Sequence, residues 1–166
     1  TEWNEIPIPA GFTIRLHGFV NANGSWQLLV SNWRPWHPPS LGRLAKSVSD
    51  PEQRPEYGLY LVDPERGTFA YLFPGSDAAV SGDGRFALFE RARGARHELL
   101  AWDASTGKTT TLAVLTERDP GSGRSFSWTW RTGEPVADIE GTAQGLGSFR
   151  LVYRAETGTL QKATRD

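Results

Sequence analysis

The side chains that most often do chemistry in proteins are few and scattered in this sequence. It contains no Cys and three His, which are His17, His37 and His97. None of the three has further ligand residues at the spacing of a metal site, and the lack of Cys excludes thiolate ligands, disulfides and a Cys nucleophile. Serine-hydrolase, phosphate-loop and zinc-protease motifs are also absent. We therefore predict a protein that is not an enzyme and has no cofactor or metal.

Side chains suited to recognition occur in two loop-like segments. In TERDPGSGRS, the Gly-Ser-Gly tip around Ser122 is small enough to enter a cleft that larger side chains could not. Similar tips occur at Ser76 and Ser81 in FPGSDAAVSGDG. The competing interpretation is that these runs are plain flexible linkers.

The second segment, WRPWHPPS, combines a stiff Pro-containing run with Trp and Arg, which often dominate the binding energy of protein interfaces. These Trp side chains could instead pack under their own loop. The residues predicted to contact a partner are Ser122, Gly121, Gly123, Arg124, Ser76, Trp33, Arg34 and Trp36.

The elements that must carry these loops are indicated by a phrase that recurs three times. In each copy an apolar run is followed by a polar turn and a second strand-like run. Asp63 and Asp103 open the turn in two copies, while Gly67, Gly107 and Gly158 stand in register near its end. An Asp that bonds the turn backbone and a Gly with positive φ are typical of a tight hairpin. The copies are LYLVDPERGTFAYLF (59–73), LAWDASTGKTTTLAVL (100–115) and LVYRAETGTLQ (151–161).

A second phrase precedes the first in two of these units. NANGSWQLLVSNW matches SGDGRFALFERA, with Gly24 aligned to Gly84, so each unit holds two hairpins and four antiparallel strands in about forty residues. The stretch SGDGRFALFERARGARHELLAWDASTGKTTTL resembles the blade repeat of TolB-type and related WD-like β-propellers. The resemblance implies an all-β fold of three antiparallel four-stranded blades that form an open or incomplete β-propeller.

The predicted blades form a single domain over residues 1–166. They span approximately 11–73, with an insertion at 34–57, then 74–115 and 116–166. In the last unit, residues 134–148 keep no clean strand pattern. Alternation within the strands predicts that Trp26, Trp102, Trp128 and Trp130 lie in the core.

Three blades are fewer than a closed propeller normally has, which is roughly four to eight. The chain could be a piece of a longer propeller, it could oligomerise to complete a ring, or it could form an open stack. We favour the open stack. In propeller topology one edge of the blades carries several of the connecting segments. These are the insertion, the turn at 93–96, the blade linkers and the irregular 134–148 segment. We expect the functional residues at this edge, because loops carry binding residues more often than scaffolds do.

The net charge and the hydropathy of the sequence argue against two classes of partner, nucleic acids and membranes. The chain has 18 basic and 19 acidic residues, which disfavours nucleic acid, and it has no apolar run long enough to insert in a membrane. A small, Cys-free, propeller-like chain that starts at Thr1 is similar to the periplasmic immunity proteins that inhibit type VI-secreted peptidoglycan amidases by loop insertion. The resemblance implies a periplasmic inhibitor whose partner is a secreted amidase. The alternative is a propeller fragment or self-completing oligomer that binds a small ligand or hydrolyses a substrate.

Overall fold

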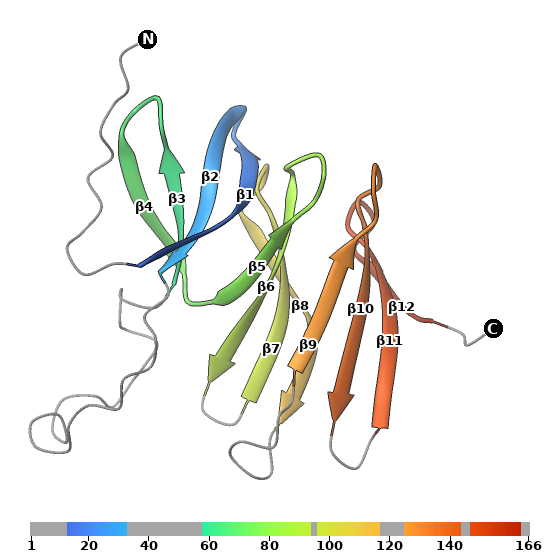
Figure 1. Cartoon of the computed structure of the whole chain (residues 1–166). Coiled ribbons are helices and arrows are strands. Elements are labelled where there is room, and N and C mark those ends of the chain that lie inside the picture. The colour runs from blue at the N-terminus through green and yellow to red at the C-terminus, as the bar shows by residue number, and fades with distance from the viewer. Residues whose placement is uncertain (1–12, 33–57, 94–95, 117–124, 144–146, 164–166) are drawn as a thin grey trace, which may run out of the picture.

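Twelve β-strands and no helix make up the part of the chain that the computed structural model describes, which is residues 13–32, 58–93, 96–116, 125–143 and 147–163 (Figure 1). They form three antiparallel sheets of four strands each. The prediction of three four-stranded propeller-like blades that do not close into a ring is therefore confirmed. No helix in these residues could span a membrane.

Each sheet follows chain order, so every strand pairs with its neighbours in sequence. Blade 1 contains β1 (Ile14–Ala22), β2 (Ser25–Asn32), β3 (Leu59–Asp63) and β4 (Thr68–Phe73). Blade 2 contains β5 (Ser76–Val80), β6 (Phe86–Arg93), β7 (Arg96–Asp103) and β8 (Lys108–Thr116). Blade 3 contains β9 (Ser125–Trp130), β10 (Val136–Ala143), β11 (Gly147–Arg154) and β12 (Thr159–Lys162).

One sequence-based expectation about blade 3 is wrong. Residues 134–148 were expected to be irregular, but Val136–Ala143 is a full strand, β10, which pairs with β9 on one side and β11 on the other. Its polar face carries Asp138 and Glu140, and Gly141 interrupts its apolar face because the Phe149 ring occupies the space that a Cβ would need. Asp, Glu and Gly are depleted in strands, which weakens the strand signal of this segment.

The hairpin turns form as the repeated phrases predict. Gly67, Gly107 and Gly158 have φ values of 63°, 71° and 66°, a region in which L side chains are strained. In the first copy, Asp63 Oδ1 accepts hydrogen bonds from the backbone N–H groups of Glu65 and Arg66. The Gly with positive φ is therefore common to all three turns, whereas an Asp side chain accepts turn N–H groups only in blades 1 and 2.

The first strands of the blades lie at the inner side of the stack. β1 contacts β5 and β5 contacts β9, while the later strands of each sheet lie farther out, as in a propeller (Figure 1). Gly18 of β1 makes the first of these approaches possible, because a Cβ there would lie 3.1 Å from the Val80 side chain. The Trp130 indole N–H donates to the Ala79 carbonyl oxygen at 3.0 Å and links β9 to β5.

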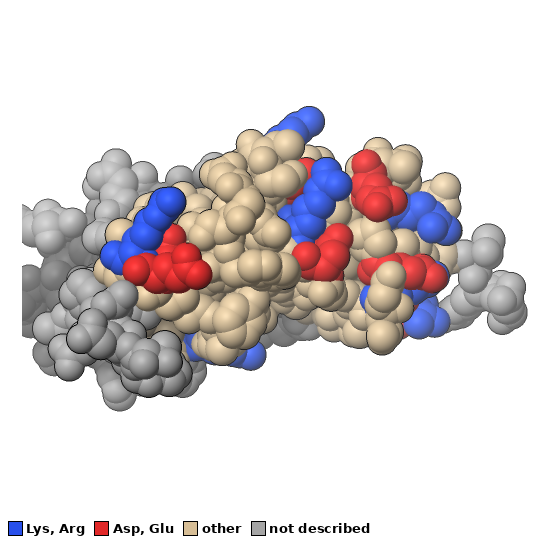
Figure 2. All heavy atoms as spheres, turned by 90° about the horizontal axis from the view of Figure 1, so that it is seen from above, with Lys and Arg blue, Asp and Glu red and all other residues tan. Residues whose placement is uncertain are grey.

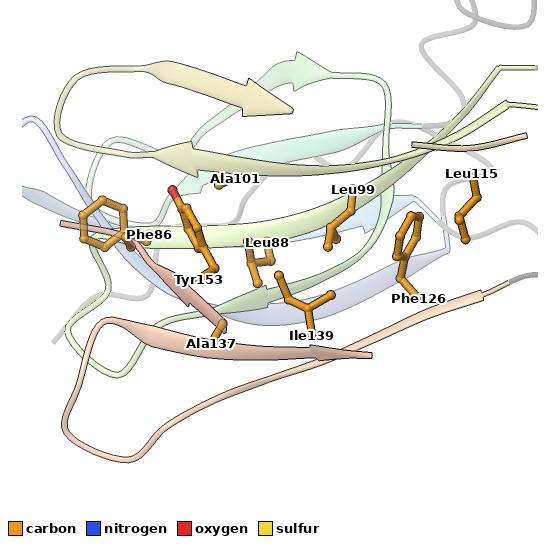
Figure 3. Packing of buried hydrophobic residues seen from close by; sticks show 10 residues of the cluster. Phe86, Leu88, Leu99, Ala101, Leu115, Phe126, Ala137, Ile139 and Tyr153 are labelled. Atoms are coloured by element: carbon orange, nitrogen blue, oxygen red, sulfur yellow. The ribbon is translucent and has the colours of Figure 1, made fainter. Parts of the chain in front are cut away.

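The core is divided into layers between the sheets. Between blades 1 and 2, Leu29 and Leu59 pack against Phe89 and Trp102. Between blades 2 and 3, the side chains of the middle sheet face those of the last (Figure 3). Successive residues of β6 therefore enter opposite layers, which explains its continuous apolar run, FALF, because both faces of the middle sheet are buried.

The four tryptophans predicted to be core have different environments. Trp102 is 3% exposed, as predicted, and Trp128 and Trp130 are partly buried against the layer between blades 2 and 3. The prediction for Trp26 is wrong, since its side chain is 54% exposed. Its ring instead lies beside Gly84 in the β5–β6 turn.

Candidate functional site

The strand order defines the edge of the sheets from which the predicted partner-binding loops leave. β2 and β3 are joined by the segment that contains the insertion at 34–57, and β8 and β9 are joined through residues 117–124. In an up-and-down sheet these connections, and the β6–β7 turn, leave from the edge opposite the Gly-containing hairpins. We call this the loop edge. The 134–148 segment was wrongly assigned to it, because most of that segment is β10.

Most of the predicted contact residues are not described by the structure. Ser76 is the exception, since it begins β5 at the loop edge and its backbone pairs with Glu90 of β6. The residues that lie outside the described part of the chain are Gly121, Ser122, Gly123, Arg124, Trp33, Arg34 and Trp36.

Ser81 is not an exposed tip, contrary to the sequence-based expectation. It is 4% exposed, and its hydroxyl lies 2.5 Å from Asp83 Oδ1 and accepts a hydrogen bond from the Phe86 N–H at 2.9 Å. These contacts fix the β5–β6 turn. Ser81 is therefore a structural residue of that turn.

A cavity of about 360 Å³ opens between the first strands of the blades, near the loop edge. We call it the axial cleft. Arg15 of β1, Asp77 of β5 and Glu90 of β6 supply its charged groups, while Phe126 and Trp128 of β9 supply an aromatic wall. These residues are far apart in sequence, and no motif connects them. Sequence reasoning therefore missed this site.

Two strand irregularities shape the axial cleft. The register of β1 shifts between Leu16 and Gly18, and that of β5 shifts between Ser76 and Ala79. Within the second shift Asp77 has a φ of 46°, which is unusual for a residue other than Gly. Its Oδ1 lies 2.6 Å from Arg15 Nη1. Such bulges and strained residues are frequent beside functional sites.

His17 connects the two irregular strands behind this ion pair. Its Nε2 lies 2.7 Å from the Ser31 hydroxyl, and the ring also bonds to the backbone of Ala78. Burial lowers the pKa of His17, although the bond to Ala78 opposes the shift. The ring therefore favours its neutral form and has a structural role here.

Other charged groups that the structure describes near this edge form ion pairs. His97 Nδ1 lies 2.7 Å from Glu90 Oε1, and the buried Glu98 carboxylate binds both Arg91 and Arg96. No group of three or more His, Cys, Asp or Glu suited to a metal occurs among the described residues.

A second feature is an exposed apolar stripe on blade 1. Leu16, Phe19 and Trp26 are 55%, 58% and 54% exposed. Leu16 pairs with Val30, Phe19 with Leu28 and Trp26 with Asn21 across β1 and β2. Because paired residues share a sheet face, the three side chains form one stripe at the β1 edge of blade 1. Leu16 and Phe19 lie on the face that points away from blade 2, while the Trp26 ring reaches the Gly84 turn.

The hairpin edge opposite the loop edge offers a smaller groove. It has a volume of about 230 Å³ and lies between the β7–β8 and β11–β12 turns, where Asp103, Lys108 and Tyr153 are among its lining residues. Figure 2 shows that acidic and basic side chains alternate across the surface seen from above, without a large area of one sign. This surface offers no strong attraction for a highly charged polymer.

Comparison with known proteins gives only a distant likeness. No protein family profile and no curated protein matches the chain. Among solved structures, the chain is similar to a protein from Lactobacillus plantarum, with 12% identity and a TM-score of 0.38. The match covers 99% of this chain and 45% of that protein, so the chain spans less than half of its length.

Proposed function

We propose that this chain is a protein-binding module that inhibits its partner. The observation that carries the proposal is the exposed stripe of Leu16, Phe19 and Trp26 on a regular two-stranded surface. Clustered exposed apolar side chains are uncommon on proteins without a partner, and Trp is among the residues that contribute most to interfaces.

The placement of the stripe suits binding by a rigid surface. Gly84 O accepts a hydrogen bond from the Asn21 N–H at 2.9 Å, and this bond holds the β1 edge against blade 2. Side chains fixed on a paired sheet lose little conformational entropy on docking, so more of the contact energy appears as affinity. Leu16 follows Arg15 of the axial cleft in β1 but points to the other face of that edge strand, so a partner that contacts both must reach around the β1 edge.

The resemblance to immunity proteins leads to a more specific proposal. The partner is then a secreted peptidoglycan amidase in the periplasm, and the Gly-Ser-Gly tip at Ser122 enters its active-site groove. The insertion with Trp33, Arg34 and Trp36 adds contact area beside the tip, and Ser76 is the second choice for the inserted residue.

The experiment is capture of partners from lysate and culture supernatant of the source organism, followed by assay of peptidoglycan cleavage by the captured protein. Phe19→Glu should lower capture by at least about 30-fold, as expected for loss of an interface residue worth about 2 kcal/mol. Leu160→Glu on β12 is the matched control, because Leu160 is also exposed, and it should have no effect.

The inhibitor proposal also predicts how the enzymatic activity of the captured protein responds to this chain. Adding the chain should stop peptidoglycan cleavage, and Ser122→Arg should restore it. A stoichiometric partner without hydrolase activity would contradict the amidase proposal while leaving the binding module intact. Equal capture by Phe19→Glu and the unaltered chain would contradict the role of the stripe.

The alternative function, binding of a small ligand, is favoured by one observation. The groove between the β7–β8 and β11–β12 turns combines the Tyr153 ring with Asp103 and Lys108. A ligand bound there would raise the melting temperature of the chain in the absence of any protein partner, so a thermal-shift screen separates the two functions.

A further inference from the structure

The axial cleft takes lining side chains from all three blades. Its volume of about 360 Å³ is at the small end of the range for ligand sites, which suits one long side chain better than a folded segment. Arg15 lines the cleft from β1, the edge strand that carries Leu16 and Phe19 of the exposed stripe on its other face. A protein bound on the stripe can therefore reach the cleft with a side chain that passes around the β1 edge.

The charged groups of the cleft favour a cation. Asp77 and Glu90 are acidic, and Arg15 is held by Asp77 at 2.6 Å. The Glu90 side chain is 17% exposed and its Oε1 lies 2.7 Å from His97 Nδ1, while no hydrogen bond or ion pair joins its second oxygen, Oε2, to a described residue. This carboxylate therefore keeps an acceptor for an incoming donor.

The aromatic wall adds a second attraction for the same kind of group. Phe126 is 6% exposed and Trp128 is partly buried against the core layer between blades 2 and 3. Packing on that layer holds both rings in place. The face of a Trp ring attracts ammonium and guanidinium groups, and both rings provide apolar surface for the methylene stem of such a side chain.

We propose that the axial cleft binds a Lys or Arg side chain of the partner protein, with its charged end at Glu90 and its stem against Trp128. This inference rests on the protein-binding function proposed above and adds the chemistry of one partner residue. It predicts that the partner presents a protruding basic residue next to an apolar surface that covers Leu16 and Phe19.

The test is a nuclear magnetic resonance titration of the unaltered chain with Nα-acetyl-lysine amide and with Nα-acetyl-arginine amide. The signal to follow is the indole N–H of Trp128, assigned with the Trp128→Phe variant. Nα-acetyl-norleucine amide is the uncharged control. We expect a saturable shift with one or both cationic probes, and binding at least about tenfold weaker with norleucine, because it lacks the charge-assisted bond.

Two variants separate the cleft from a general charge effect. Glu90→Gln should weaken the cationic probe about tenfold, whereas Glu140→Gln, which removes an exposed carboxylate from the far face of blade 3, should change nothing. Thermal unfolding verifies that both variants are folded. Equal binding of norleucine, no shift with either cation, or full affinity in Glu90→Gln would each overturn the proposal.

The result also distinguishes this inference from the proposed function. If the probes fail to bind while Phe19→Glu still abolishes capture of the partner, the cleft is not a cation site and the binding module stands. If the probes bind but no protein is captured, the cation site stands and its ligand is a free small molecule, which overturns the assignment to a protein side chain.

Discussion

The two end faces of the stack are built from different chemistry. The face of blade 1 that points away from blade 2 has the buried side chains of Val30, Tyr60 and Val62 at its centre and the exposed stripe along β1 and β2. On the opposite face of the stack, Asp138 is bound by Arg131 at 2.8 Å and Glu140 by Arg150 at 2.7 Å. One end is apolar, and the other is covered with ion pairs.

Equivalent positions in the middle blade show how this difference arises. Leu88 and Leu99 of blade 2 are fully buried against blade 3. In blade 3 the corresponding register positions are held by Asp138 and Arg150, because β10 and β11 pair in the same way as β6 and β7. Two substitutions thus convert an inter-blade face into one that is stable in water.

This asymmetry bears on self-association. Head-to-tail stacking would place the apolar face of blade 1 on the ion pairs of blade 3, and desolvating those charges is costly. Because Val30, Tyr60 and Val62 at the centre of the blade 1 face are already buried, a partner would contact blade 1 at the exposed stripe. The ion pairs of blade 3 therefore disfavour a ring closed by joining blade 1 to blade 3.

The largest expected effect comes from moving the charge of blade 3 into blade 2. Leu88→Asp would bury an unpaired carboxylate between two sheets and should lower the free energy of unfolding by about 3–5 kcal/mol. The reciprocal change, Asp138→Leu, lies on an exposed face and should alter it by at most about 1 kcal/mol. Urea unfolding measures both. If both variants lost a similar amount of unfolding free energy, positions 88 and 138 would not differ in burial as the structure indicates.

A second change would make the two ends alike. The double variant Asp138→Leu with Arg150→Leu removes one partner from each ion pair and extends the apolar surface around Val152. We expect the fold to persist, with stability within about 1 kcal/mol of the unaltered chain, and association to increase with protein concentration. Light scattering measures the association, and a double variant that stays as dispersed as the unaltered chain would count against the role of these charges.

A third test introduces charge on the exposed stripe of blade 1, instead of removing charge from blade 3. Phe19→Glu and Leu16→Glu place charges on side chains that are already more than half exposed, so each should change the free energy of unfolding by about 0.5 kcal/mol or less. A loss of several kcal/mol in urea unfolding would instead show that these residues stabilise the fold. In that case their effect on partner capture would not report binding.

The sequence predicts the fold wherever its signal is local. The positions of Gly67, Gly107 and Gly158 follow from turn chemistry that needs only a few neighbouring residues, and the strands of blade 2 are marked by apolar runs. β10 was missed because Asp138, Glu140 and Gly141 are residue types that are depleted in strands. The same polar face that caps the stack thus conceals the strand.

The candidate sites depend on arrangements that are not local. Alternation shows that Trp26 shares a face with Leu28, but it does not show that the Trp26 ring is exposed and lies beside Gly84 of the β5–β6 turn. The axial cleft joins Arg15, Asp77 and Trp128 through bulges whose positions no turn motif marks. The partner contacts at Ser122, Trp33, Arg34 and Trp36 lie outside the described residues and remain predictions.

The smallest expected effect concerns His17, which joins blade 1 to blade 2 near the axial cleft. Its pKa is lowered in the folded chain, mainly by burial, so the unfolded chain binds a proton more readily. The contribution of neutral His17 to stability is therefore complete above its unfolded pKa of about 6.5 and decreases as the pH falls toward the folded value. Urea midpoints at about pH 7 and about pH 5 should differ less in His17→Gln than in the unaltered chain. Asp77 and Arg15 remain in that variant, so an unchanged pH dependence would assign the effect to groups other than this imidazole.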